Sequence, residues 1–499
     1  MESSILKNAR LNSLSRRMSR STSYDDWLRL AFDHDELSGK DQWKAREECS
    51  LYDSAEIRIR YNNLSRLLEE GDYTGLLYAL NEGVHGNMGG MGRPILYDQA
   101  KVGTKHLINE YVDIIVKSLH VISESSNQEI PFAEKLDFFR RASHCYGRSA
   151  LMMSGGAGLI YFHHGMVQTL IDNDALPNVI SGASAGSWIS AQLGTKTDEE
   201  LKAGHFTHYR YNLPRGENPL KILTGMSDRY TALSIKEMAI DGIANDMTFQ
   251  EAFEHTGRYI NISIAPTEKH QTSRLMNAIT SPNVYVRSAI DASASVPGVV
   301  PPVTLYAKGA NGKPKPYLPS RKWYDGSFSE DLPAKRLSRL FGVNHYIVSL
   351  INPLALPFVS DPKLRRNQQV TKVASGLLLS AVKELMLRTE DTISRYGSSF
   401  ATPAILLSHA VLDQEYTGDI NIILRKKDFY WRNALFSYIR DAEVDDLIMA
   451  GRRNTWSKLA MIKNATAISK TLDNILENMD QGELDQLAMP HKRHLTTVM

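Results

Sequence analysis

The amino-acid sequence predicts an α/β protein with a three-layer core, in which helices cover both faces of a mainly parallel sheet. Two strand–turn–helix units are the first observation: apolar runs at 150–153 and 176–180 each lead through small residues into a helical pattern. Further strand-like runs at 259–264 and 346–350 alternate with helical segments. Strands that alternate with helices are typical of parallel sheets covered on both faces.

The composition is that of a globular protein with balanced charge. Of the 499 residues, 42% are hydrophobic, and 58 basic residues against 56 acidic ones leave a net charge of +2. A dedicated nucleic-acid binder would carry a basic patch, so we expect no nucleic-acid partner. The 2 cysteines are too few for a disulfide framework or a four-ligand zinc site, and no His, Cys and carboxylate cluster has metal-ligand spacing. We therefore expect no metal and no cofactor.

Neither secretion nor membrane insertion is indicated by the sequence. Residues 1–18 contain basic side chains but lack the continuous apolar stretch of a signal peptide. No uninterrupted apolar run approaches the ~18 residues that span a bilayer. Together with the low cysteine content, this predicts a cytoplasmic protein that is soluble or peripherally attached to a membrane.

Changes in pattern along the chain predict four regions. Residues 1–22 are rich in Ser and Arg and are expected to form a flexible arm. Helical periodicity over 23–147 predicts a helical domain, and alternating strands and helices over 148–352 predict the α/β domain. Residues 353–499 are expected to form a mostly helical region, with one strand at 420–424, that packs on the α/β core.

A Gly-x-Ser-x-Gly sequence follows the second strand and consists of Gly182, Ser184 and Gly186 with their neighbours. Small residues around the serine let the strand and helix backbones approach closely, and the turn places the hydroxyl at a helix N-terminus. Free amides and the helix dipole favour negative charge there. In this context we interpret Ser184 as a catalytic nucleophile in preference to part of a tight structural turn.

A serine nucleophile needs amide donors for the oxyanion and a base for its proton. Gly155, Gly156 and Ala157 follow the first strand and precede a helix, so their amides suit the first task, although a turn that binds nothing fits them equally well. Asp325, followed by Gly326, holds a carboxylate on a turn at a predicted strand end, a pattern that ordinary β-turns share.

Histidines are the alternative source of a base. In an α/β-hydrolase the order would be Ser, then Asp or Glu, then His. Each histidine after Ser184 fits a surface or packed position better than a catalytic loop, and these residues are His205, His208, His255, His270, His345, His409 and His491.

The glycine-rich turn, the Gly-Ala-Ser-Ala-Gly turn and the Asp-Gly-Ser turn together resemble the patatin-like phospholipase family. In that family a Ser–Asp dyad hydrolyses lipid esters without a histidine. The resemblance implies that Ser184 is the nucleophile and Asp325 its base, and that the amides after the first strand form the oxyanion hole. Gly326 and Ser327 complete the third motif, and the implied fold is a patatin-like three-layer core.

The resemblance extends beyond the motifs and covers about residues 24–476. Trp43, the glycine-rich segment 83–92 and residues 103–105 look like the DUF3336 extension of yeast and plant triacylglycerol lipases and of bacterial relatives. Residues 414–420 look like the C-terminal part of the same branch. The resemblance implies a bacterial member of this branch that acts on an acyl lipid, either phospholipid or triacylglycerol, in transient contact with a membrane or lipid-droplet surface.

The sequence departs from the family pattern at several positions. Ser154 stands where many relatives have the first of three glycines, and a glycine and a basic residue of plant patatins are missing from 159–161. Ser327 replaces the usual Gly or Ala. An oxyanion hole needs amides rather than glycine itself, so Ser154 is a mild change, whereas the missing glycine leaves the choice of donors open. His163 and His164 are interpreted as packing or polar support.

Two segments offer a surface for lipid: an apolar loop at 354–359 and a helical stretch at 373–387. The alternative, which we favour, is that both cover the catalytic core. Two other functions stay open, namely a histidine-triad esterase of soluble esters and a degenerate lipid-binding scaffold. The altered oxyanion turn is the only support for the scaffold.

Overall fold

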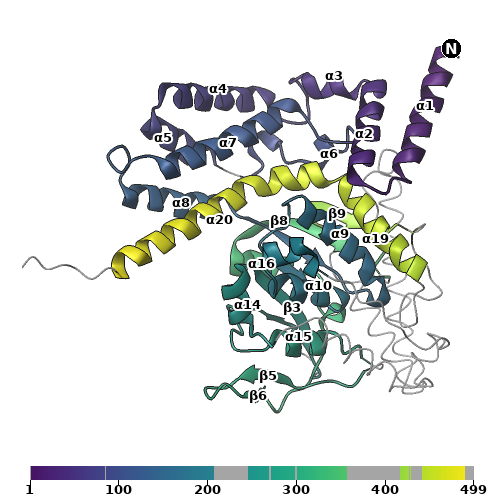
Figure 1. Cartoon of the computed structure of the whole chain (residues 1–499), viewed down its shortest axis with the longest axis vertical. Coiled ribbons are helices and arrows are strands. Elements are labelled where there is room, and N and C mark those ends of the chain that lie inside the picture. Colours follow the sequence, from purple (N-terminus) through teal and green to yellow (C-terminus); the bar gives the residue numbers. More distant parts are fainter. Residues whose placement is uncertain are drawn as a thin grey trace, which may run out of the picture. The chain divides into compact units, whose positions relative to one another are not determined.

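The computed structural model describes residues 2–84, 86–206, 246–268, 271–297, 300–353, 355–356, 416–425, 428 and 441–488 (Figure 1). The chain forms two compact units, residues 1–38 with 149–462 and residues 39–148 with 463–499. Residues 463 onward therefore group with the helical unit, whereas the sequence predicts that all of 353–499 packs on the α/β core. The predicted helical stretch at 373–387 lies outside the described residues.

Two helices of the helical unit have clear sequence signals at their ends. Asp53 and Asp72 cap them by accepting hydrogen bonds from the amides of Glu56 and Gly75, and Gly71 ends the first with a φ of 68°. The elements are α3 (Lys40–Ala45), α4 (Ser54–Glu70), α5 (Tyr73–Gly83), η1 (Met88–Gly90), α6 (Pro94–Tyr97), α7 (His106–Glu124), α8 (Phe132–Tyr146) and most of α20 (Leu459–Ala488).

Two residues singled out in the sequence, Trp43 and Lys105, are in contact within this unit. The Nζ atom of Lys105 lies 4.1 Å from the centre of the Trp43 ring and donates hydrogen bonds to the carbonyls of Trp43 and Arg46 at 2.6 and 2.7 Å. Burial of Lys105 lowers its pKa. The ammonium group thus joins α3 to the start of α7, which is a structural role.

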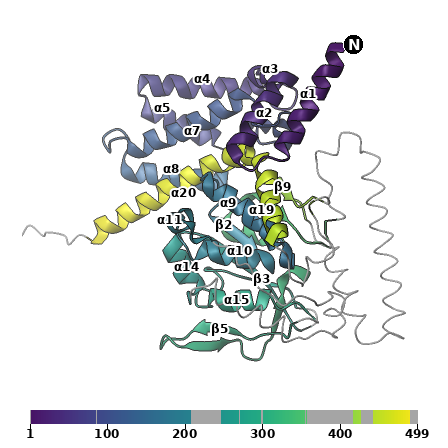
Figure 2. The same cartoon turned by 45° about the vertical axis from the view of Figure 1, so that its right-hand side comes forward.

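The first residues of the other unit form a helix, which corrects the prediction of a flexible arm at 1–22. Helix α1 (Glu2–Met18) packs on α2 (Tyr24–Ser38), and Leu14 and Met18 are buried (Figure 2). The Ser- and Arg-rich composition conceals this pair of apolar residues, which are spaced by one helical turn. Helix α19 (Asp441–Trp456) completes the cluster by bringing Trp456 to 6.2 Å from Trp27, measured between ring centres.

Seven strands of the described residues form a sheet at the centre of this unit, and this sheet confirms the predicted α/β fold with a mainly parallel sheet. The strand order is β4-β3-β2-β1-β8-β9, with β7 also paired to β3. The pairs β1–β2, β2–β3 and β8–β9 are parallel, and β4 and β7 run antiparallel to β3. The strands are β1 (Arg148–Met153), β2 (Val179–Gly182), β3 (Tyr259–Pro266), β4 (Arg274–Met276), β7 (Trp323–Asp325), β8 (Val343–Leu350) and β9 (Ile420–Ile423), with a separate hairpin of β5 (Leu305–Lys308) and β6 (Pro314–Tyr317).

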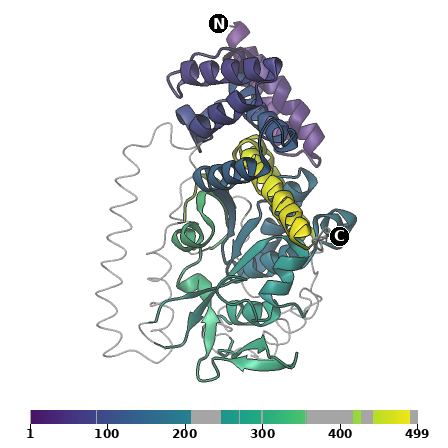
Figure 3. The same ribbon diagram turned by 90° about the vertical axis from the view of Figure 1, so that its left-hand side faces the viewer.

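Helices flank this sheet (Figure 3). Helix α9 packs on α19, α10 on β2 and β3, α15 on β3, and α16 on β8. The helical elements are η2 (Ala157–Leu159), α9 (Ile160–Asp172), α10 (Ala185–Gly194), α11 (Asp198–Glu200), the π-helical turn η3 (Leu201–His205), α14 (Phe249–Thr256), α15 (Val286–Ser293), η4 (Gly326–Phe328) and α16 (Ala334–Phe341). Among the described residues, no helix combines the length and apolar character needed to cross a membrane.

Candidate active site

Ser184 occupies a sharp turn between β2 and α10. Its φ and ψ of 49° and −118° are strained for a residue with a side chain, which is the backbone expected of a nucleophile elbow. The two glycines of the motif are required by close contact, because a Cβ on Gly182 would lie 2.2 Å from the carbonyl carbon of Gly186, and one on Gly186 would lie 2.3 Å from the oxygen of Met153. The amide of Ser184 donates to Ser293 Oγ at 2.9 Å.

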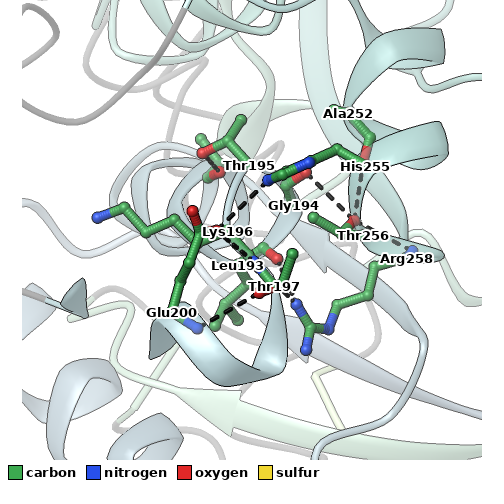
Figure 4. Close-up of polar contacts among 11 residues, drawn as sticks. Leu193, Gly194, Thr195, Lys196, Thr197, Glu200, Ala252, His255, Thr256 and Arg258 are labelled. Atoms are coloured by element: carbon green, nitrogen blue, oxygen red, sulfur yellow. Dashed lines mark hydrogen bonds and ion pairs between the residues drawn. The ribbon is translucent and has the colours of Figure 1, made fainter. Parts of the chain in front are cut away.

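The far end of α10 is held by a buried arginine, Arg258, next to β3 (Figure 4). Its Nη1 donates to the carbonyls of Leu193 and Lys196 at 2.9 and 2.8 Å, and Nη2 contacts the carboxylate of Asp198. Burial lowers the pKa of Arg258, while Asp198 acts in the opposite direction. A cation at a helix C-terminus is stabilised by the free carbonyls, so Arg258 fixes the helix whose other end carries Ser184.

We expect Arg258→Leu to lower the free energy of unfolding by about 3 kcal/mol, because two helix-end carbonyls and Asp198 lose their donor. Chemical denaturation followed by tryptophan fluorescence measures this change. Arg339→Leu is the matched control, since Arg339 is exposed on α16, and it should change stability by no more than about 0.5 kcal/mol. Equal effects of the two substitutions would contradict the role given to Arg258.

Asp325 ends β7 and is 1% exposed. Burial raises the pKa of its carboxyl group to about 6, against the smaller opposing effects of the Ser327 amide and of the Ser184 and Ser327 side chains. Oδ1 accepts a hydrogen bond from the Ser327 amide at 2.8 Å. Oδ2 is buried and has no partner with hydrogen-bond geometry among the described residues. Asp325 therefore has the raised basicity and the unoccupied oxygen that a general base needs.

The three sequence motifs meet beyond the carboxyl ends of the parallel strands. Gly182 at the end of β2 is level with Ile262 on β3, and Asp325 is level with Ile264 two residues farther along the same strand. Gly155 joins them from the end of β1, since a Cβ there would lie 3.2 Å from Ser184 Cβ. Ligands of parallel α/β sheets bind beyond the carboxyl ends of the strands, which is where these residues gather.

The glycine-rich turn differs in one respect from the sequence-based expectation. The Gly155 amide donates to Oδ1 of Asp331 at 2.7 Å, so it is not available to an oxyanion. In the described part of the chain no hydrogen bond is found from the amides of Gly156 and Ala157. Ala157 has a φ of 47°, a conformation that non-glycine residues seldom adopt. Of the three amides expected to form the oxyanion hole, those of Gly156 and Ala157 are therefore the two without a hydrogen-bond partner in the described part of the chain.

Sequence reasoning missed Asp331, which is fully buried beside this turn. In the sequence it follows Glu330 and looks like half of an ordinary exposed acidic pair, since charged residues are almost never fully buried. Ser293, which accepts the Ser184 amide, lies in a run of alanines and serines before Pro297, and nothing in the sequence marks it as a partner of Ser184.

The described histidines downstream of Ser184 lie away from it. His345 contacts Ser149 at 3.1 Å, near the start of β1, and His255 lies at the end of α14, just before β3 begins. Both are at the opposite ends of the strands from Ser184. His208, His270, His409, His491 and the side chain of His205 are outside the described residues. Within the described chain, no three His, Cys, Asp or Glu side chains gather in a way that could hold a metal ion.

Comparison with known proteins gives two family matches. Residues 151–337 match "Patatin-like phospholipase", and residues 5–144 match "Domain of unknown function (DUF3336)". A patatin-like phospholipase domain-containing protein of Aspergillus clavatus is 30% identical, and the match covers 96% of this chain and 70% of that protein. The chain belongs to the patatin-like phospholipase family. Its helical unit falls largely within the DUF3336 match.

Other relatives are also fungal members of the patatin-like phospholipase family. One from Pyricularia oryzae is 35% identical over 93% of this chain and 63% of its own length, and one from Debaryomyces hansenii is 31% identical over 92% and 60%. The chain thus spans about 60% of these relatives. None of these relatives supports the expected bacterial source. A solved structure, VipD from Legionella pneumophila, aligns with a TM-score of 0.31 and 13% identity over 64% of this chain and 67% of VipD.

Proposed function

We propose that this patatin-like phospholipase is a serine hydrolase of lipid esters that uses Ser184 and Asp325 as a catalytic dyad. The observation that carries the proposal is the position of Asp325, buried beside the nucleophile elbow with an unoccupied Oδ2 and a pKa raised to about 6. A serine hydroxyl is a weak nucleophile until a base removes its proton. A carboxylate in water is too weak a base for this task, and burial makes it more basic by raising its pKa.

In the first half of the reaction, Ser184 Oγ attacks the ester carbonyl carbon and its proton passes to Asp325. The carbonyl oxygen becomes an oxyanion, which the amides of Gly156 and Ala157 stabilise. When the carbon–oxygen bond to the alcohol breaks, Asp325 returns the proton to the leaving alkoxide. The acyl group remains as an ester on Ser184.

The second half releases the acid by the same groups. A water molecule attacks the acyl-enzyme carbonyl while Asp325 accepts one of its protons. Collapse of the second oxyanion breaks the bond to Ser184, and Asp325 gives the proton back to the serine oxygen. The cycle therefore needs a base that is ionised at neutral pH and that exchanges a proton in turn with Ser184 Oγ, the leaving alkoxide and the attacking water. We assign these transfers to Asp325, whose pKa is raised to about 6.

The substrate class is inferred from family membership and the location from the low cysteine content of the sequence, and both are parts of the proposal. We infer phospholipid or triacylglycerol as substrate, transient contact with a membrane or lipid-droplet surface, and a cytoplasmic location. Of the loop at 354–359 that suggested this contact, the structure describes residues 355 and 356.

The test is fatty-acid release from phosphatidylcholine vesicles and from emulsified triolein, measured side by side. We expect the wild-type protein to hydrolyse at least one of the two lipids and to prefer one by about tenfold or more, since phosphatidylcholine carries a zwitterionic head group where triolein carries a third acyl chain. Soluble p-nitrophenyl butyrate serves as the comparison substrate. Hydrolysis of the soluble ester with no action on either lipid would contradict the lipid-ester proposal and favour an esterase of soluble substrates.

A further inference from the structure

The glycine-rich turn rests on a fully buried carboxyl group, that of Asp331. Its Oδ1 accepts the Gly155 amide at 2.7 Å, and its Oδ2 accepts Nδ2 of Asn352 at 2.9 Å. The Asn352 Nδ2 atom also lies 3.4 Å from the hydroxyl of Tyr416. Asp331 follows η4, Asn352 follows β8 and Tyr416 precedes β9. One carboxyl group therefore connects the turn after β1 to the segments that follow η4 and β8, and through Asn352 to the residue before β9.

Ser154, the residue before the turn, makes hydrogen bonds through both its side chain and its backbone carbonyl. Ser154 Oγ accepts the amides of Ile351 and Asn352 at 2.9 and 3.2 Å. The Ser154 carbonyl lies 2.9 Å from Nε2 of His163, which must be the donor because a carbonyl can only accept. Nδ1 of the neutral ring then accepts from Ser349 Oγ at 2.7 Å. The serine that replaces a family glycine thus supplies a hydroxyl that fixes the turn.

These contacts restrain the backbone of the turn. Because Asp331 and Ser154 fix the backbone on either side of the Gly155 peptide, the next two amides have little freedom to reorient. A Cβ on Gly156 would lie 2.6 Å from the Ile351 side chain, so this backbone also packs tightly against the segment after β8. Without Asp331 the buried Gly155 amide would lack an acceptor, and the turn would have to shift to find one.

We propose that Asp331 is a positioning residue for the oxyanion hole: it holds the Gly155 amide and thereby leaves the Gly156 and Ala157 amides directed at the ester oxygen. This inference rests on the proposed Ser–Asp hydrolase and adds to it the choice of donors. Removal of a single oxyanion donor typically costs about 10²–10³-fold in kcat, which sets the scale of effect for a turn that loses its support.

The protonation state of Asp331 supports this role. Burial raises its pKa to about 8, and the nearby charge of Asp325 acts in the same direction, whereas the bonds from Asn352 and Gly155 lower it. Among the described residues, the other titratable groups facing this site are Tyr416, whose pKa is raised by burial, and His163, whose pKa burial lowers to about 4. At neutral pH Asp331 therefore keeps its proton and Asp325 carries the negative charge. A neutral Asp331 places no second negative charge beside a developing oxyanion.

The test compares Asp331→Leu with Asp331→Asn, because asparagine keeps an oxygen that can accept the Gly155 amide. The primary readout is the second-order rate of Ser184 labelling by a fluorophosphonate probe, with kcat and KM on p-nitrophenyl butyrate beside it. We expect Asp331→Leu to lower the labelling rate and kcat by about 10²-fold with KM within about twofold, and Asp331→Asn to stay within about fivefold of wild type. Glu330→Gln is the control, since Glu330 contacts Ser273 and Arg336 and should label at the wild-type rate.

A second readout covers the case in which Asp331→Leu does not fold. The labelling rate of the wild type should fall as the pH rises through about 8, and Asp331→Asn should lose this decline because an amide does not ionise. Wild-type rates for Asp331→Leu, or the same alkaline decline in Asp331→Asn, would overturn the inference. A wild type that is labelled at Ser184 but inert on lipids would refute the lipid substrate while leaving the Asp331 comparison intact. Absence of Ser184 labelling in the wild type would refute the dyad and this inference together.

Discussion

Replacing Ser184 with Ala should reduce fatty-acid release by about 10⁴-fold or more, because loss of the nucleophile removes the covalent pathway entirely. The same substitution should abolish labelling by a fluorophosphonate. The fold should survive, since the side chain of Ser184 does not hold the elbow together: its amide, which bonds to Ser293, remains. The substitution removes only the hydroxyl group and keeps Cβ, so the strain of a backbone with a φ of 49° is largely unchanged.

Ser190→Ala is the matched control for this prediction. Ser190 lies in the same helix, and its hydroxyl bonds to the Gly186 carbonyl at 2.9 Å, so the two substitutions remove the same atom from neighbouring turns. We expect near wild-type turnover for Ser190→Ala. Residual activity of Ser184→Ala comparable to that of this control would show that another residue is the nucleophile.

The part of the fold that the sequence predicts is the part encoded in short, continuous patterns. The strand, glycine turn and helix from Ala150 to Leu170 and the elbow around Ser184 each have an apolar run, small residues and a helical period in order. The structure confirms the α/β class and the mainly parallel sheet. It also places Ser184 beside Asp325, while the catalytic roles of both remain a prediction.

What the sequence could not predict depends on contacts between distant segments. The three-residue strand β7 is too short to show periodicity, yet its antiparallel pairing with β3 is what brings Asp325 to Ser184. Asp331 looks the same in sequence whether it is exposed or buried, and its contact with Gly155 could not be anticipated from spacing. Helix α1 was missed because its apolar residues are few, and their burial against α2 shows only in three dimensions.

Replacing Asp325 with Asn should lower kcat by about 10³–10⁴-fold, because an amide of the same shape cannot accept the proton of Ser184. In the wild type, kcat/KM should rise about tenfold per pH unit up to a pH of about 6, where the carboxyl group whose pKa is raised to about 6 becomes ionised. The pH–rate profile of p-nitrophenyl butyrate hydrolysis measures this limb, and the residual activity of Asp325→Asn should not show it.

A measurement of the free energy of unfolding shows whether Asp325→Asn loses activity through catalysis or through unfolding. The pKa of Asp325 is higher in the folded chain than its ordinary value of 3.8, so the folded state binds the proton more tightly. The contribution of this group to stability is then fully present below a pH of about 4 and is lost as the pH rises to about 6. Asp325→Asn has no charge to bury and should be at least as stable as wild type at pH 7.

Asp172→Asn, an exposed change at the end of α9, controls for the substitution itself and should leave turnover unchanged. If Asp325→Asn were stable and still active with an unaltered acid limb, a different residue would have to be the base, and the histidines outside the described residues would be the first to test.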